Sequence, residues 1–209
     1  MPVSGNDSDN VGAAGRRVAV VPATFDPPTN GHLEMIGRAS RLFDQVVVAV
    51  YRSPNKQTLF DPQERLALMR AAIAEAGLHN VRVRPYDGLT VDMARDEGAL
   101  ALVKGIRNVS DFDYEAQMSH MNGQLAPEIE TVAILASAQY SFLSSTLVRE
   151  VAKLGGDVQR WVPDVVAARL REKYAQPAAP GASPAAFALD AEGSADRFGG
   201  FVAQDERVR

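Results

Sequence analysis

The feature that most constrains the fold is a repeated alternation between short apolar runs and longer segments with helical periodicity. Most of these runs are rich in valine and continuously apolar, which is typical of strands covered by helices on both faces. The alternation predicts an α/β fold, a single doubly wound Rossmann-like domain with a five-stranded parallel sheet. The predicted strands are Val18–Val21, Val46–Tyr51, Val81–Val83, Leu100–Val103 and Thr131–Leu135.

The helix boundaries are marked by capping residues and glycine stops. Asp61 is a predicted N-cap, with Pro62 at the first helical position and Glu64 completing a capping box. In doubly wound sheets, ligands bind beyond the carboxyl ends of the strands, at the point where strand order reverses. The predicted helices are Asn30–Phe43, the helix that begins after Asp61, Asp111–Leu125, Ser144–Leu154 before Gly155-Gly156, and Pro163–Tyr174.

The predicted domain covers residues 16–174, between two extensions of different composition. Residues 1–15 are polar, and residues 175–209 are rich in Ala, Pro and Gly, so both extensions are predicted to be disordered. Of the 26 acidic and 22 basic residues, the extensions hold seven and three, which leaves 19 of each in the domain. A neutral domain lacks the basic field that nucleic-acid binding needs, so no nucleic-acid partner is expected.

The expected cellular location rests on three features that the sequence lacks: a membrane helix, a secretory signal and cysteine. No stretch approaches the roughly 20 apolar residues of a membrane helix, and the start has no basic and apolar regions of a secretory signal. The chain has no cysteine, which excludes disulfides, thiolate catalysis and cysteine metal sites. We therefore expect a cytoplasmic protein with no membrane partner.

The segment after the first strand is the leading candidate for chemistry. Two prolines and small polar residues connect Pro22 to Asn30, where a helix begins, so His32 falls in the first turn of that helix. Free backbone N–H groups and the helix dipole favour an anion there. An imidazole at this place can donate a hydrogen bond to a phosphate oxygen as negative charge builds up.

The same segment resembles the signature of the HxGH/TxGH nucleotidyltransferase superfamily. Its TxGH form, Thr24-Phe25-Asp26-Pro27 followed by Thr29-Asn30-Gly31-His32, is similar to that of bacterial phosphopantetheine adenylyltransferases. The resemblance covers about residues 17–174 and excludes both extensions. Its other motifs, in order, are 53–56 (SPNK), 103–107 (VKGIR), 111–115 (DFDYE), 120–122 (HMN), 140–146 (YSFLSST) and 155–158 (GGDV).

This resemblance implies transfer of the adenylyl group of ATP to 4′-phosphopantetheine, which gives dephospho-coenzyme A and pyrophosphate by direct in-line displacement. The reaction brings two anions together, so it needs positioning and distributed positive charge more than a nucleophile. Mg²⁺ is expected as cofactor, held mainly by substrate phosphates, with no protein metal-ligand set. The resemblance further implies a homohexamer and feedback inhibition by coenzyme A.

The resemblance also assigns roles to residues. His32 would stabilise the pentacoordinate α-phosphorus, Arg107 would grip the outer phosphates, and Lys56 completes the catalytic set. The acceptor would be bound by Thr24, Lys56, Leu89, Thr90 and Lys104. The expected ATP-binding residues are Thr24, Phe25, His32, Gly105, Ile106, Arg107, Glu115, Tyr140, Ser141, Phe142, Leu143, Ser144, Ser145 and Thr146.

Without the resemblance, several of these residues have structural interpretations. Lys56 alone is a typical solvated loop lysine, and Lys104 and Arg107 could be surface charges after a strand. Ser144 and its neighbours form an N-cap cluster, so capping accounts for at least one hydroxyl. The stripe that includes Met118 and Met121 favours packing or a subunit contact.

The sequence departs from the commonest family pattern at three positions. Ala23 stands where glycine is usual, Thr146 where serine is frequent, and Lys104 where many members have arginine. None removes a reacting group, so an active enzyme is expected. One alternative is a related transferase with another phosphorylated acceptor, such as nicotinate mononucleotide or glycerol 3-phosphate. A second alternative is a non-catalytic nucleotide-binding paralogue.

Overall fold

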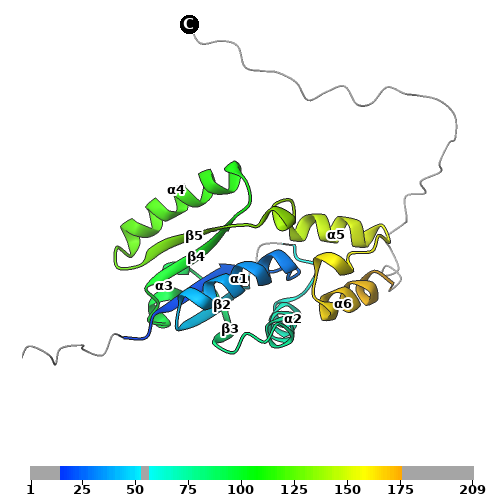
Figure 1. The fold of residues 1–209 in the computed structure, drawn as a ribbon, viewed down its shortest axis with the longest axis horizontal. Helices are drawn as coiled ribbons and strands as arrows, with labels where there is room; N and C mark the ends of the chain where they lie inside the picture. Colours follow the sequence, from blue (N-terminus) through cyan, green and yellow to red (C-terminus); the bar gives the residue numbers. More distant parts are fainter. Residues whose placement is uncertain (1–14, 53–56, 176–209) are drawn as a thin grey trace, which may run out of the picture. The chain divides into compact units, whose positions relative to one another are not determined.

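The computed structural model describes residues 15–52 and 57–175, and these contain one five-stranded sheet in which every strand pair is parallel (Figure 1). The strand order is β3-β2-β1-β4-β5, so the direction of winding reverses between β1 and β4. The predicted fold class is confirmed. The strands are β1 (Val18–Ala23), β2 (Gln45–Tyr51), β3 (Val81–Tyr86), β4 (Ala101–Ile106) and β5 (Glu130–Leu135).

Helices cover both faces of the sheet. On one face, α1 (Asn30–Leu42) and α2 (Pro62–Glu75) pack on inward side chains such as Val21 and Val48. On the other face, α3 (Thr90–Asp96) and the segment after α4 (Val109–Leu125) pack on Val20 and Leu102. Strands β1, β2 and β4 are largely buried on both faces, which explains why their apolar runs are continuous rather than alternating. The apolar run of strand β5 is continuous as well, but Ala133 and Leu135 are exposed.

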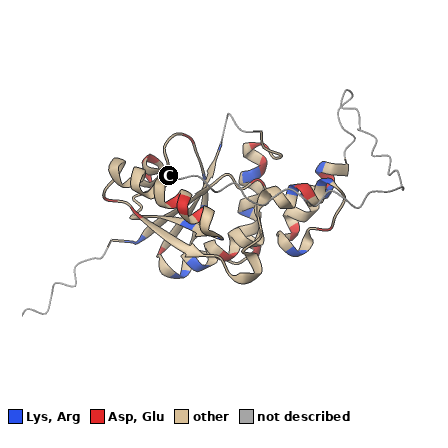
Figure 2. Cartoon of the chain, turned by 90° about the horizontal axis from the view of Figure 1, so that it is seen from above, with Lys and Arg blue, Asp and Glu red and all other residues tan. Residues whose placement is uncertain are grey.

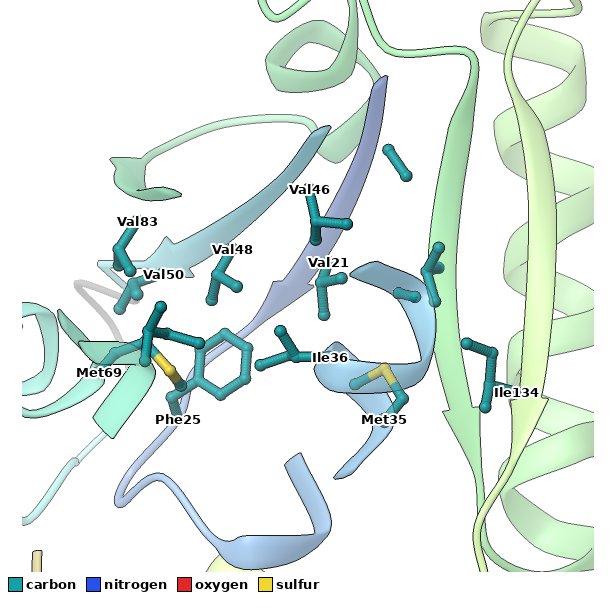
Figure 3. Packing of buried hydrophobic residues seen from close by; sticks show 14 of the residues in the cluster. Val21, Phe25, Met35, Ile36, Val46, Val48, Val50, Met69, Val83 and Ile134 are labelled. Atoms are coloured by element: carbon teal, nitrogen blue, oxygen red, sulfur yellow. The ribbon is translucent and has the colours of Figure 1, made fainter. Parts of the chain in front are cut away.

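The larger core cluster lies between the sheet and helices α1 and α2. Phe25 belongs to this cluster together with Ile36 and Met69, so the loop after β1 is anchored in the core (Figure 3). A third cluster joins α2 to α5 (Ser145–Lys153), the 3-10 turn Gln159–Trp161 and α6 (Asp164–Ala175). Because the Phe25 side chain is packed in the larger core cluster, the neighbouring loop residues are held in fixed positions.

The hydrogen bonding between β1 and β4 is short. β1 pairs with β2 along its whole length, but it pairs with β4 only at Ala19 and Val20. Beyond Val20, Pro22 has no N–H and cannot contribute a donor to either neighbouring strand. The carboxyl halves of β1 and β4 are therefore free to separate, which opens the sheet at its topological switch point.

The element boundaries correct the sequence predictions in several places. Strands β1, β3 and β4 run two or three residues beyond the predicted ends, through Pro22, Pro85 and Gly105. A proline is tolerated in β3 because it is an edge strand. Helix α3 was not predicted, since it has only seven residues and Leu89 provides no side-chain cap. Asp61 caps α2 with Pro62 at its first position, as predicted.

Basic and acidic residues occur on the same helices of the described part (Figure 2). Within residues 15–52 and 57–175, no helix is both long and apolar enough to span a membrane. The predicted extensions, residues 1–15 and 175–209, fall almost wholly outside the described residues.

Candidate active site

A pocket of about 500 Å³ opens at the carboxyl ends of β1 and β4, where the two strands separate. Its wall is formed by the end of β1, the loop that follows, the first turns of α1, α4 and α5, and the end of β4. The pocket gathers most of the residues that the sequence motifs singled out: Thr24, Phe25, His32, Lys104, Gly105, Arg107, Glu115, Tyr140, Leu143, Ser144, Ser145 and Thr146.

His32 is held by the N-terminal cap of α1. Thr29 accepts a hydrogen bond from the His32 backbone N at its Oγ1 (3.3 Å), and its own N–H donates to His32 Nδ1 (3.0 Å). A main-chain N–H can only donate, so Nδ1 is unprotonated and the neutral ring carries its proton on Nε2. Nε2 has no hydrogen-bond partner within the described part of the chain.

The electrostatics keep this ring neutral. Burial, and to a lesser extent the positive charge of Arg107, lower the pKa of His32 to about 4. The Phe25 ring lies edge-on to the imidazole, with ring centroids 5.0 Å apart, and fixes its orientation. His32 therefore offers a fixed N–H donor near neutral pH, not a proton that it can readily give up.

Two of the predicted cations in the pocket are paired with carboxylates on α4. Arg107 donates from Nε and Nη2 to Asp111 (2.8 and 3.0 Å) and from Nη1 to the Leu143 carbonyl (3.0 Å). Hydrogen bonds from Arg107 hold the pKa of Asp111 below its usual value. Lys104 Nζ lies 3.1 Å from Glu115 Oε2, an oxygen that has no hydrogen-bond partner of good geometry among the described residues.

The start of α5 forms another part of the wall, and its hydroxyls have internal partners. Ser144 Oγ caps the helix by accepting from Leu147 N (3.2 Å). Ser145 Oγ donates to the Pro27 carbonyl (2.7 Å), which ties α5 to the loop after β1. The first backbone N–H groups of α5 have no intrahelical acceptor, which makes this helix end suitable for an anion.

Some predicted site residues do not line the pocket. Ile106 is buried in the sheet, and Ser141 and Phe142 are exposed. Leu89 occupies the N-cap position of α3 and is exposed, and Thr90 begins that helix. Both follow β3, which lies two strands from β1. Lys56 lies outside the described residues, as does the whole 53–56 motif.

The pocket also contains charged residues that the sequence interpretation did not single out. Arg149 Nη1 lies 3.2 Å from Asp26 Oδ2 and also donates to the Asp26 carbonyl. Glu34, one turn into α1, also lines the wall. Arg149 follows Ser145 by four residues, so helical spacing could have placed both on one face of α5.

The backbone at Ala23, the last residue of β1, does not require glycine. Phe25 is the non-glycine residue with positive φ (52°) in the described part of the chain, so Ala23 keeps an ordinary backbone conformation. Gly105 is exposed in the pocket, and a Cβ added there would point toward Met35 Cγ at 3.6 Å. The wall of the pocket at β4 is thus bare backbone, which a ligand can approach closely.

The chain is similar to a known protein family and to several proteins of assigned function. Residues 20–151 match the model of the cytidylyltransferase-like family. The chain is 50% identical over 157 residues to a phosphopantetheine adenylyltransferase from Synechococcus sp. (strain JA-3-3Ab), covering 75% of this chain and 98% of that protein. It is 54% identical over 162 residues to the phosphopantetheine adenylyltransferase of Frankia casuarinae, covering 77% of this chain and 99% of the relative.

A solved structure confirms the fold at greater sequence distance. A protein from Vibrio parahaemolyticus, described as a nicotinate-nucleotide adenylyltransferase, aligns with a TM-score of 0.59 at 21% identity. The alignment covers 77% of this chain and 95% of that one. At this identity, the likeness extends to the fold alone.

Proposed function

The chain belongs to the cytidylyltransferase-like family and, within it, to the phosphopantetheine adenylyltransferases, and on that premise we propose that ATP and 4′-phosphopantetheine react in the pocket between β1 and β4. The enzyme transfers the adenylyl group of ATP to 4′-phosphopantetheine and releases dephospho-coenzyme A and pyrophosphate. The observation that carries the site proposal is the convergence of His32, Arg107 and Ser145 on one pocket from segments far apart in the sequence.

The chemical step needs no nucleophile from the protein. An oxygen of the acceptor phosphate attacks the α-phosphorus, and the bond from the α-phosphorus to the oxygen that bridges to the β-phosphate breaks. Negative charge grows on the equatorial oxygens during this step. The Nε2–H of His32 would donate to one of these oxygens, and such preorganised donors act mainly on the transition state.

The triphosphate side of the pocket would be formed by helix ends and arginines. The first turns of α1 and α5 present free backbone N–H groups. Arg107 would bind the outer phosphates, and its bidentate contact with Asp111 holds the guanidinium in place. Glu115 Oε2, which pairs with Lys104 without a hydrogen bond of good geometry, would accept a hydrogen bond from the nucleotide.

The charge of the described lining supports a requirement for Mg²⁺. The lining holds three cations (Lys104, Arg107 and Arg149) and four carboxylates (Asp26, Glu34, Asp111 and Glu115), which leaves one net negative charge. A triphosphate therefore needs additional positive charge. Residues 15–52 and 57–175 contain no cluster of three or more side chains suited to a metal. Mg²⁺ would be held mainly by phosphate oxygens and water, which is the usual mode of binding for this ion, and it would neutralise the triphosphate.

The acceptor would enter from the side of β2 and β3. Thr24 lies at the end of β1 in the pocket wall, and its hydroxyl would bind the acceptor phosphate with help from Lys56 and Lys104. Leu89 and Thr90 lie at the end of β3, two strands away. The pantetheine arm is long and extended, so it would reach these residues while its phosphate stays near Thr24.

Assembly and regulation are also part of the proposal. Helix α4 has 17 residues but only Asn122 is buried, whereas Tyr114, Met121 and Leu125 are exposed. They lie at helical spacing on one stripe, and an apolar stripe of this kind favours a subunit contact. We expect a cytoplasmic homohexamer that coenzyme A inhibits by competing for the acceptor side.

A direct product assay tests the proposed function. Purified enzyme incubated with ATP, Mg²⁺ and 4′-phosphopantetheine should form dephospho-coenzyme A, detected by mass spectrometry, with equimolar pyrophosphate. Nicotinate mononucleotide and glycerol 3-phosphate serve as alternative acceptors in parallel reactions. Faster pyrophosphate release with either of them would reassign the acceptor, and ATP binding without turnover would identify a non-catalytic paralogue.

A further inference from the structure

The most unusual buried group outside the pocket lining is the guanidinium of Arg65. Arg65 is the fourth residue of α2, and its side chain is fully buried. No ion pair within the described part of the chain involves it, and its partners are four main-chain carbonyls. They are Phe60 (from Nε, 3.2 Å), Thr24 and Tyr51 (both from Nη1, 2.7 and 2.6 Å) and Arg52 (from Nη2, 2.9 Å).

These carbonyls belong to three different segments. Thr24 follows the end of β1, Tyr51 and Arg52 end and follow β2, and Phe60 precedes α2. Four of the five N–H groups of the guanidinium are used, so the side chain fixes the positions of three segments at once. A lysine could not do this, because it is a single flexible point charge with three donors.

The burial of this charge needs an explanation other than stability. Replacing buried charges with apolar side chains of similar volume is often neutral or stabilising. Burial lowers the pKa of Arg65, and the nearby Asp26 and Asp61 partly counteract this effect. What the guanidinium provides, and an apolar side chain would not, is a fixed geometry for the strand ends beside the pocket.

The loop that Arg65 holds contains a strained residue. Phe25 has a φ of 52°, in the left-handed region that bulky residues rarely adopt, and such strain persists only where the surroundings impose it. On one side, Arg65 binds the Thr24 carbonyl. On the other side, the Asp26 carboxylate accepts from Leu59 N (2.8 Å) and Phe60 N (2.9 Å). The strained residue between them packs its ring against His32.

From this arrangement we infer that Arg65 is a positioning residue for adenylyl transfer. By holding the Thr24 carbonyl, it fixes the Thr24 hydroxyl toward the acceptor phosphate and maintains the strained turn that orients His32. The inference rests on the proposed roles of Thr24 and His32 in the pocket. Arg65 itself does not line the pocket and touches no substrate.

The test compares Arg65→Lys with Arg169→Lys. Arg169, on α6, donates to Glu64 Oε1 (2.6 Å) and so also anchors α2, but it does not reach the Thr24 loop. Arg65→Lys should lower kcat/KM for 4′-phosphopantetheine on the order of tenfold to hundredfold, because a displacement of ~1 Å can cost ~10²-fold. ATP affinity, measured by calorimetry, should stay within about threefold. Arg169→Lys should change only the melting temperature.

Two results would overturn the inference. The first is a folded Arg65→Lys enzyme whose kcat/KM for 4′-phosphopantetheine equals that of the wild type. The second is a variant in which ATP affinity and turnover fall by the same factor. If Arg65→Lys does not fold, Arg65→Gln keeps a planar donor group without the buried charge. It should likewise lose kcat/KM for 4′-phosphopantetheine while its ATP affinity stays nearly unchanged. Failure of both variants to fold would assign Arg65 to folding alone. A wild type without turnover would instead refute the proposed function.

Discussion

Replacement of His32 by alanine separates the chemical and structural roles of this side chain. In the proposed reaction, the Nε2–H of His32 stabilises charge on the α-phosphate. In the fold, its Nδ1 accepts the Thr29 N–H at 3.0 Å and completes the cap of α1. His32→Ala removes both interactions, so it should reduce turnover and stability by amounts that can be measured independently.

The expected loss of turnover is large. Removing one preorganised donor from a site of developing charge costs about 10²–10³ in kcat, or roughly 3–4 kcal/mol. ATP affinity should change less than about tenfold, because interactions that strengthen only in the transition state affect kcat. The stability cost arises from the Thr29 N–H, which loses its acceptor, and should be about 1–2 kcal/mol. For a domain of this size, that lowers Tm by roughly 3–6 °C.

The assay combines three measurements on each variant: steady-state formation of dephospho-coenzyme A, ATP binding by calorimetry and thermal unfolding. Glu64→Ala is the matched control, since Glu64 occupies the same position in the capping box of α2, where it accepts the Asp61 N–H at 3.0 Å. Glu64 also pairs with Arg169 and Lys173, so its removal should lower Tm at least as much. Its kcat should stay within about twofold of wild type.

A fall in kcat of less than tenfold in folded His32→Ala enzyme would contradict the proposed role of the imidazole in the transition state. A loss of turnover in Glu64→Ala in proportion to its loss of stability would also contradict this role, since kcat would then report on fold integrity. A parallel drop of ATP affinity and kcat in His32→Ala would make the imidazole a ground-state binding group.

The lowered pKa of His32, the exposed stripe on α4 and the proposed requirement for Mg²⁺ can each be tested separately. The pKa of His32 is near 6.5 in the unfolded chain and about 4 in the folded chain, so the free energy of unfolding should fall as pH drops from 6.5 to 4, by at most about 3 kcal/mol. His32→Ala should show a flatter dependence of Tm on pH. Met121→Glu should dissociate the assembly in sedimentation velocity, whereas Leu154→Glu, at another exposed leucine, should leave it intact; a wild-type monomer would contradict the subunit contact. Chelation of Mg²⁺ should abolish product formation while Tm without ATP is unchanged, and a Tm loss on chelation would point to a metal bound by the protein itself.

The elements that the sequence predicted well are those with redundant local signals. The cap at Asp61 combines an N-cap, a proline and an acidic third position, and α2 begins there in the structure. The valine-rich strands are buried on both faces, so their continuous apolar pattern was unambiguous. By contrast, α3 is short and uncapped by a side chain, and β3 runs through Pro85, so local pattern was insufficient for both.

In the candidate site, too, local sequence motifs were predictable and contacts between distant segments were not. The motif that ends at His32 is contiguous, and its residues meet in the pocket because one loop carries them. The contacts that set the electrostatics join residues far apart in the chain, such as Arg149 with Asp26 and Arg65 with Thr24. No spacing rule connects such positions, because three-dimensional packing brings them together.

The amino-acid sequence alone was sufficient for the parallel α/β fold and for the family, since periodicity, caps and contiguous motifs are local properties of the chain. Only the tertiary structure showed the protonation state of His32, the pairing of the pocket cations and the hydrogen bonds that hold the loop on either side of the strained Phe25. These properties depend on burial and on distances between segments, which exist only once the sheet has been assembled.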